Sequence, residues 1–196
     1  MSKTLFSLAV VAISLQAEGL SQKDRDFAMS YLHATRKQVL DAVDGLTEAQ
    51  WKFKQADDRW SVAQVLEHIV VTERALLGMV QKTASGPASP VPEASKVKDE
   101  DIMKMISSRE KKVQAPEQLR PTGSLGTGAS EIEQFKQARD ATINYVQTTN
   151  DDLRAHSGKS PLGQVDCVQW LLYIGAHSER HLAQILEVKA DPKFPK

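Results

Sequence analysis

The sequence predicts an all-α protein, a four-helix bundle with a long crossover between its second and third helices. Four stretches repeat apolar side chains at the helical period, and each begins near a residue that caps helices well. No segment shows the apolar and polar alternation of a half-buried strand. The chain has 196 residues, 41% of them hydrophobic, which is enough to bury a core.

The first two helices are predicted on either side of a loop. Residues 21–24 (SQKD) resemble a capping box, and Gly45 suits the end of the helix that follows. A loop with one helical turn is expected over 47–58. Ser61 and Gln64 then form a second capping box, which opens the next long helix.

The second half of the chain predicts two further long helices. The connection that precedes them has three parts, a Pro/Ala/Ser-rich stretch, a short helix and a glycine-rich loop (83–95, 99–108 and 116–130). A third capping box, SEIE at 130–133, opens the third long helix. After a turn region over 150–163, Asp166 caps a fourth helix, which runs to about Lys189.

Charge and cysteine content exclude several classes of protein. Lys and Arg total 25, as do Asp and Glu, so the formal net charge is zero, whereas a nucleic-acid-binding protein would show a basic excess. The single cysteine, Cys167, permits neither an intrachain disulfide nor a cysteine-based zinc knuckle. We interpret it as a small buried residue rather than as a thiol whose pKa is lowered by a helix N-terminus.

The first seventeen residues, MSKTLFSLAVVAISLQA, predict a cleaved secretory signal peptide. Lys3 precedes an apolar run from Leu5 to Leu15, and Ala17 suits a cleavage site. The run is about half of the roughly 20 residues that span a bilayer, so no stable membrane span is expected. The alternative is an additional helix that packs on the domain over 21–190. Cleavage would give an exported or periplasmic protein, and an uncleaved chain would be cytoplasmic.

Three of the five histidines form a candidate metal site. His177 and His181 lie four residues apart on the apolar face of the predicted fourth helix, so both rings project from one side. His68 lies on the apolar side of the second helix. Buried imidazoles need polar partners, and a metal ion would satisfy all three together. Three histidines with coordination positions left open are typical of catalytic zinc. The alternative is that they are hydrogen-bonded core residues.

Two of these segments resemble the DinB-like superfamily. They are WSVAQVLEHI at 60–69, followed by Glu73, and HSERHLAQI at 177–185. Residues 135–139 of the third helix are also similar, and the resemblance extends from about Asp24 to the C-terminus.

The resemblance implies a fold and a chemistry. The fold is an up-down-down-up bundle with a long crossover between helices two and three. The chemistry rests on a divalent metal ion, zinc or nickel, bound by His68, His177 and His181. Relatives include S-transferases and isomerases that use thiol cofactors, and many are described only as metal-dependent hydrolases; homodimers are common. Export would separate this chain from cytosolic thiols.

Several other residues are candidates for supporting roles. Gln184 could orient a ligand ring, because it lies three residues after His181. Arg139 either binds a substrate carboxylate or phosphate or forms a salt bridge to a neighbouring helix. Glu73 either supports the site or lies on a solvated helix face. Trp60 and Trp170 are expected to be core residues at the ends of the bundle.

Three functional interpretations follow from these residues. The first is a metal-dependent enzyme, a hydrolase or a thiol or group transferase, that acts on a small molecule. The second is a non-catalytic bundle that binds a metal ion or small ligand. The third is a structural bundle whose histidines are merely buried. No second catalytic residue can be named from the sequence, and a homodimer is expected from the resemblance.

Overall fold

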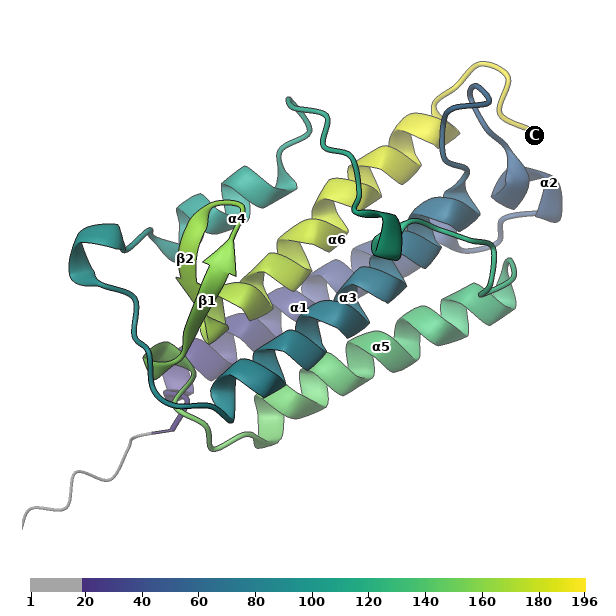
Figure 1. The fold of residues 1–196 in the computed structure, drawn as a ribbon. Coiled ribbons are helices and arrows are strands. Elements are labelled where there is room, and N and C mark those ends of the chain that lie inside the picture. The colour runs from purple at the N-terminus through teal and green to yellow at the C-terminus, as the bar shows by residue number, and fades with distance from the viewer. Residues whose placement is uncertain (1–18) are drawn as a thin grey trace, which may run out of the picture.

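Four long helices pack side by side in the computed structural model, which describes residues 19–196 (Figure 1). They are α1 (Gln22–Val43), α3 (Val62–Ala84), α5 (Ala129–Thr148) and α6 (Cys167–Lys189). Helices α1 and α3 each pack against both α5 and α6. The predicted all-helical class is confirmed for these elements, apart from one small sheet.

Short elements complete the fold. They are α2 (Glu48–Lys52), η1 (Glu93–Ser95), α4 (Asp99–Ser107), η2 (Glu117–Leu119) and η3 (Leu153–Ala155). Residues 85–128 join α3 to α5 and contain three of these elements, η1, α4 and η2. Helix α4 packs along α6, where it covers one side of the bundle (Figure 1).

The small sheet is a hairpin that the sequence pattern does not predict. Strands β1 (Ser157–Ser160) and β2 (Gly163–Asp166) are antiparallel, and Ser160 pairs with Gly163 beside the turn. The expectation of a strand-free turn over 150–163 was therefore wrong. The strand sequences SGKS and GQVD lack the apolar alternation that marks a strand, so the pairing leaves no signal in the pattern.

Capping explains where three of the four long helices begin. Ser21 accepts a bond from the amide of Asp24, and α3 and α6 each begin with a complete capping box. The predicted box at 130–133 was wrong, because α5 begins at Ala129 after Gly128. Gly128 has a φ of 65°, and the Ser130 hydroxyl donates instead to the carbonyl of Leu125.

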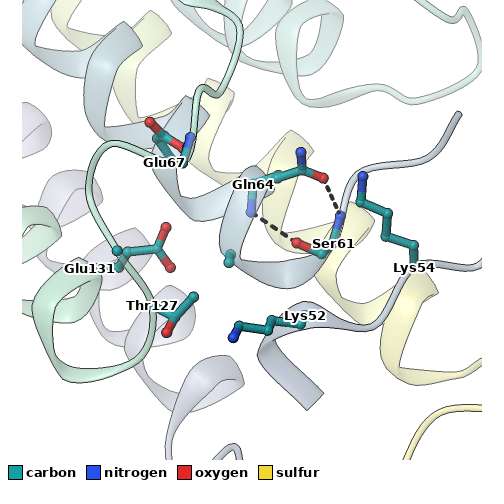
Figure 2. Close-up of a pocket in the computed structure, with 10 residues that line it drawn as sticks. Lys52, Lys54, Ser61, Gln64, Glu67, Thr127 and Glu131 are labelled. Carbon is teal, nitrogen blue, oxygen red and sulfur yellow. Dashed lines mark hydrogen bonds between the residues drawn. The ribbon is translucent and has the colours of Figure 1, made fainter. Parts of the chain in front are cut away.

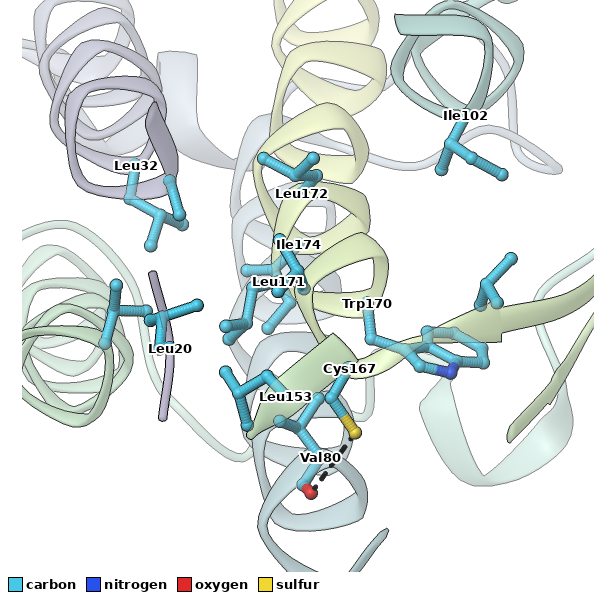
Figure 3. Packing of buried hydrophobic residues seen from close by; sticks show 14 of the residues in the cluster. Leu20, Leu32, Val80, Ile102, Leu153, Cys167, Trp170, Leu171, Leu172 and Ile174 are labelled. Atoms are coloured by element: carbon cyan, nitrogen blue, oxygen red, sulfur yellow. Dashed lines mark hydrogen bonds between the residues drawn. The ribbon is translucent and has the colours of Figure 1, made fainter. Parts of the chain in front are cut away.

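Two clusters of buried apolar side chains hold the bundle together. One includes Leu32 of α1, Ile102 of α4 and Leu171 of α6 (Figure 3). The other includes Leu66 of α3 and Phe135 of α5. All four long helices contribute side chains to both clusters, so apolar packing holds each helix over both halves of its length.

The predicted signal peptide at 1–17 lies outside the described residues. Within 19–196, no helix combines the length and the apolar character needed to cross a bilayer.

Candidate metal centre

The structure brings His68, His177 and His181 together between α3 and α6. One nitrogen of each ring lies within 4.8 Å of one nitrogen of both others. The ring centroids of His177 and His181 are 4.4 Å apart, and His68 lies 5.0 and 4.5 Å from them. All three side chains are buried, with exposed fractions of 4%, 9% and 7% in sequence order.

Hydrogen bonds orient two of the three imidazoles. The Nδ1 of His68 is 2.7 Å from the carbonyl oxygen of Leu119, and the Nδ1 of His181 is 2.9 Å from Oε1 of Gln184. Both partners are oxygens that only accept, so each Nδ1 carries the hydrogen and each Nε2 keeps a free lone pair. This arrangement, in which the second ring nitrogen is held by a carbonyl, is typical of metal-bound histidine.

Burial keeps the cluster uncharged. Burial lowers the pKa of His68, although its bond to Leu119 works the other way. Burial also lowers the pKa of His181 to about 3, with the charge of His68 adding to the effect. Burial and the charges of the other two rings also hold the pKa of His177 well below its ordinary value. Neutral imidazole is the form that binds metal ions, so the donor set fits a divalent ion with a preference for nitrogen.

Most of the chain matches a known protein family. The family model of the DinB superfamily matches residues 31–185, a stretch that includes all three histidines. The chain belongs to the DinB superfamily. The resemblance predicted from the two histidine-bearing segments is therefore confirmed.

Two individual proteins are also similar to this chain. The uncharacterized protein YuaE of Bacillus subtilis (strain 168) is 23% identical over 162 residues, which cover 82% of this chain and 96% of YuaE. YfiT from Bacillus subtilis, described as a probable metal-dependent hydrolase with an unusual four-helix bundle topology, matches in structure with a TM-score of 0.50 and 17% identity. That match covers 88% of this chain and 89% of YfiT, and it shows a shared fold.

Arg139 and Glu73 lie in the core of the bundle rather than at its surface. Arg139 has no exposed area, and its Nε is 2.8 Å from Oε1 of Glu73, which is 2% exposed. The guanidinium also donates to the Leu32 carbonyl and to the hydroxyls of Thr35 and Ser178. Of the two alternatives for Arg139, the structure shows the salt bridge, and Glu73 is not on a solvated face.

The aromatic neighbours of the histidines were not predicted. Trp60, expected in the core, is only partly buried, and its ring centroid lies 4.9 Å from that of His68. Tyr173 lies 6.3 Å from His177 in a nearly parallel orientation. A sequence signal for Tyr173 exists, because it precedes His177 by four residues and so shares its helix face. Trp170 is buried, as expected.

The backbone partner of His68 could not be found from the sequence, because a carbonyl leaves no mark in it. Glu67, the neighbour of His68 on α3, anchors the same connection. Its carboxylate accepts bonds from the amides of Gly123 and Ser124 and from the hydroxyls of Thr122 and Ser124. Burial acts to raise the pKa of Glu67, but these bonds outweigh it and the pKa is lowered. An ionised Glu67 thus holds the loop that begins just after the Leu119 carbonyl.

Proposed function

We propose that this protein is a metal-dependent hydrolase whose divalent ion, zinc or nickel, is bound by His68, His177 and His181. The observation that carries the proposal is the convergence of three buried, neutral imidazoles, two of them oriented through Nδ1. When bound at such a site, the ion supplies Lewis acidity toward water or a substrate oxygen. Three protein ligands leave coordination positions open for that purpose.

The residues around the histidines support this role. Gln184 and the Leu119 carbonyl hold two rings, and Trp60 and Tyr173 place aromatic surface beside them. Arg180 adds positive charge, since it is among the groups that depress the pKa of His177 and of His181. The proposal therefore favours a small substrate with an anionic group.

Hydrolysis is favoured over thiol transfer on two grounds. The predicted export would remove the protein from cytosolic thiols. The protein's own thiol, Cys167, has no exposed area, and burial raises its pKa to about 12. It is therefore a poor nucleophile at neutral pH.

Metal content and turnover test the proposal. Protein purified without a histidine tag should contain about one zinc or nickel per chain. It should hydrolyse ester or phosphoester substrates, and an anionic ester faster than its neutral analogue. His177→Ala should abolish both properties, whereas His33→Ala, which alters an exposed histidine of α1, should retain both. Metal binding without turnover on esters, phosphoesters or thiol acceptors would favour a non-catalytic binding protein, and protein that binds no metal would refute both functions.

Three further features belong to the proposal. We expect an up-down-down-up order of the long helices with a crossover between the second and third, which an experimental structure would test. We expect processing near Ala17 and export, which mass spectrometry of native protein would contradict by finding an intact Met1. We also expect a homodimer, and light scattering that gave a monomer mass would contradict it.

A further inference from the structure

A pocket distinct from the three histidines lies where α2, α3 and the loop before α5 meet (Figure 2). Its volume is about 410 Å³, within the range of roughly 300–1,000 Å³ found for small-molecule sites. Its lining combines two buried acids, Glu67 and Glu131, with two exposed lysines, Lys52 and Lys54.

Glu131 is an acid whose environment the fold does not explain. Its side chain is 1% exposed, and neither carboxylate oxygen has a hydrogen-bond partner among the described residues. Figure 2 shows this carboxylate pointing from α5 into the space in front of α3. An unpartnered buried carboxyl group costs free energy in either protonation state. A ligand with hydrogen-bond donors in the pocket would remove that cost.

Glu67 makes the inner side of the pocket negative. Its Oε1 accepts three bonds from the loop at 122–124, but its Oε2 accepts only one, from the amide of Gly123 at 2.7 Å. Burial, together with the charge of Glu67, raises the pKa of Glu131 to about 8. At neutral pH Glu67 is therefore ionised while Glu131 keeps its proton, and a cation between the two carboxyl groups would favour the ionised form of Glu131.

The number of free acceptors favours an ammonium group over a metal ion. Both oxygens of Glu131 and the remaining lone pair of Glu67 Oε2 give three acceptors, and an ammonium group has three N–H donors. Calcium and magnesium take about six or more oxygen ligands, and the pocket offers only these two acidic side chains. Lys52 does not supply the ammonium, because its Nζ pairs with Glu48 at 2.5 Å.

We propose that this pocket binds a small molecule that has a primary ammonium group at one end and an anionic group at the other. Glu131 and Glu67 receive the ammonium group, and the lysines at the edge, above all Lys54, attract the anionic group. The site does not require the metal centre, because no histidine lines the pocket.

Three related probes test the proposal on the full chain, by calorimetry or by NMR titration. They are 4-aminobutanoate, butylamine and butanoate. The first should bind most tightly, butylamine more weakly, and butanoate not measurably. The order should be the same in chelator-treated and zinc-loaded protein. Near pH 7, binding of either amine should release close to one proton, because Glu131 ionises on binding.

Variants separate the two ends of the ligand. Glu131→Gln should weaken both amines by about tenfold or more, since it removes a charge-assisted bond, and should abolish proton release. Lys54→Ala should weaken 4-aminobutanoate only. Glu133→Gln, which alters an exposed acid two residues further along α5, should change nothing.

Two results would overturn the inference. One is the absence of saturable binding of both amines by wild-type protein at about 10 mM, roughly tenfold above a weak ligand's Kd of about 1 mM. The other is binding of calcium or potassium that Glu131→Gln abolishes, without any binding of the amines. The first result uses wild-type protein alone, so it does not depend on the folding of a variant.

Discussion

Burial changes the protonation of acids and bases in this bundle in opposite directions. It raises the pKa of Glu131 to about 8 and lowers the pKa of His181 to about 3, with a charged neighbour adding to each effect. Both side chains are consequently uncharged at neutral pH. For the histidine this is the form that binds metal ions, whereas for Glu131 it leaves stability dependent on pH.

Glu131 should make the folded state less stable as the pH rises. Its pKa is about 8 in the folded protein, against 4.5 for an unperturbed Glu, so its contribution is fully present below pH 4.5 and is lost up to about pH 8. We expect a loss of about 2 kcal/mol after allowing for solvent screening. Urea unfolding at pH 5 and pH 8 measures it, with Glu131→Gln as the reference. The prediction would be contradicted if the free energy of unfolding changed between pH 5 and pH 8 by the same amount in wild type and in the variant.

Replacing any of His68, His177 and His181 by Ala should abolish stoichiometric metal binding. Two remaining imidazoles hold a divalent ion poorly, because the site loses one of only three protein ligands. Elemental analysis after reconstitution with zinc or nickel measures the effect, and His33→Ala is the matched control. A variant of the three that retains one equivalent of metal would show that its histidine is not a ligand.

Helix α3 carries two neighbouring residues that fix one connection. Glu67 anchors the loop at 122–124, and His68 bonds to the Leu119 carbonyl at the end of η2. The orientation of a metal-binding ring therefore depends on a loop that is distant in sequence. Glu67 would act on the metal centre through this loop rather than by binding the ion.

Glu67→Gln should weaken metal binding without abolishing it. The uncharged amide accepts fewer and weaker bonds from the loop, so the Leu119 carbonyl is held less firmly against His68. Loss of an interaction that orients a ligand costs about 10- to 100-fold in metal affinity. Competition with a chelator measures the affinity, and Glu133→Gln is the control. Equal affinities for Glu67→Gln and wild type would show that the loop does not position the ring.

Arg139 connects all four long helices. It extends from α5 and bonds to Glu73 of α3, to Leu32 and Thr35 of α1, and to Ser178 of α6, which follows His177. A buried pair of this kind is costly to break from one side, since the remaining charge is left without a partner.

Arg139→Met alone should destabilise the fold by about 3–5 kcal/mol, and so should Glu73→Leu alone. The double variant should lose much less than the sum of the two, because no unpaired charge remains in the core. Urea unfolding of the four proteins gives the coupling energy. Additive losses would mean that the two side chains act independently of each other.

The sequence predicted these elements unevenly, for identifiable reasons. Capping residues and helical periodicity located α3 and α6. The apolar faces that carry His68 and the His177/His181 pair predicted that the three side chains converge. The hairpin was missed because its strands do not alternate. Glu131 was interpreted as part of a capping box, although it lies four residues before the buried Phe135 and so shares its inward face.

For the whole molecule, a bound metal ion would link two helices that are far apart in sequence. His68 belongs to α3 and the other two ligands to α6, so an ion on all three closes a long loop as well as binding only the folded state. Stability should therefore depend on metal concentration.

We compare protein in free metal at a hundredfold its dissociation constant with the same protein after chelator treatment. Removal of the metal should lower the free energy of unfolding of wild-type protein by about 2.7 kcal/mol. For a domain of this size that corresponds to a fall in Tm of roughly 5–10 °C. His33→Ala should lose as much stability as wild type. His68→Ala, His177→Ala and His181→Ala should not respond, because they hold no ion to lose. Thermal unfolding with and without chelator measures the difference. If the three histidines were only core residues, chelator would leave the Tm of wild-type protein unchanged. That result would refute the proposed metal centre.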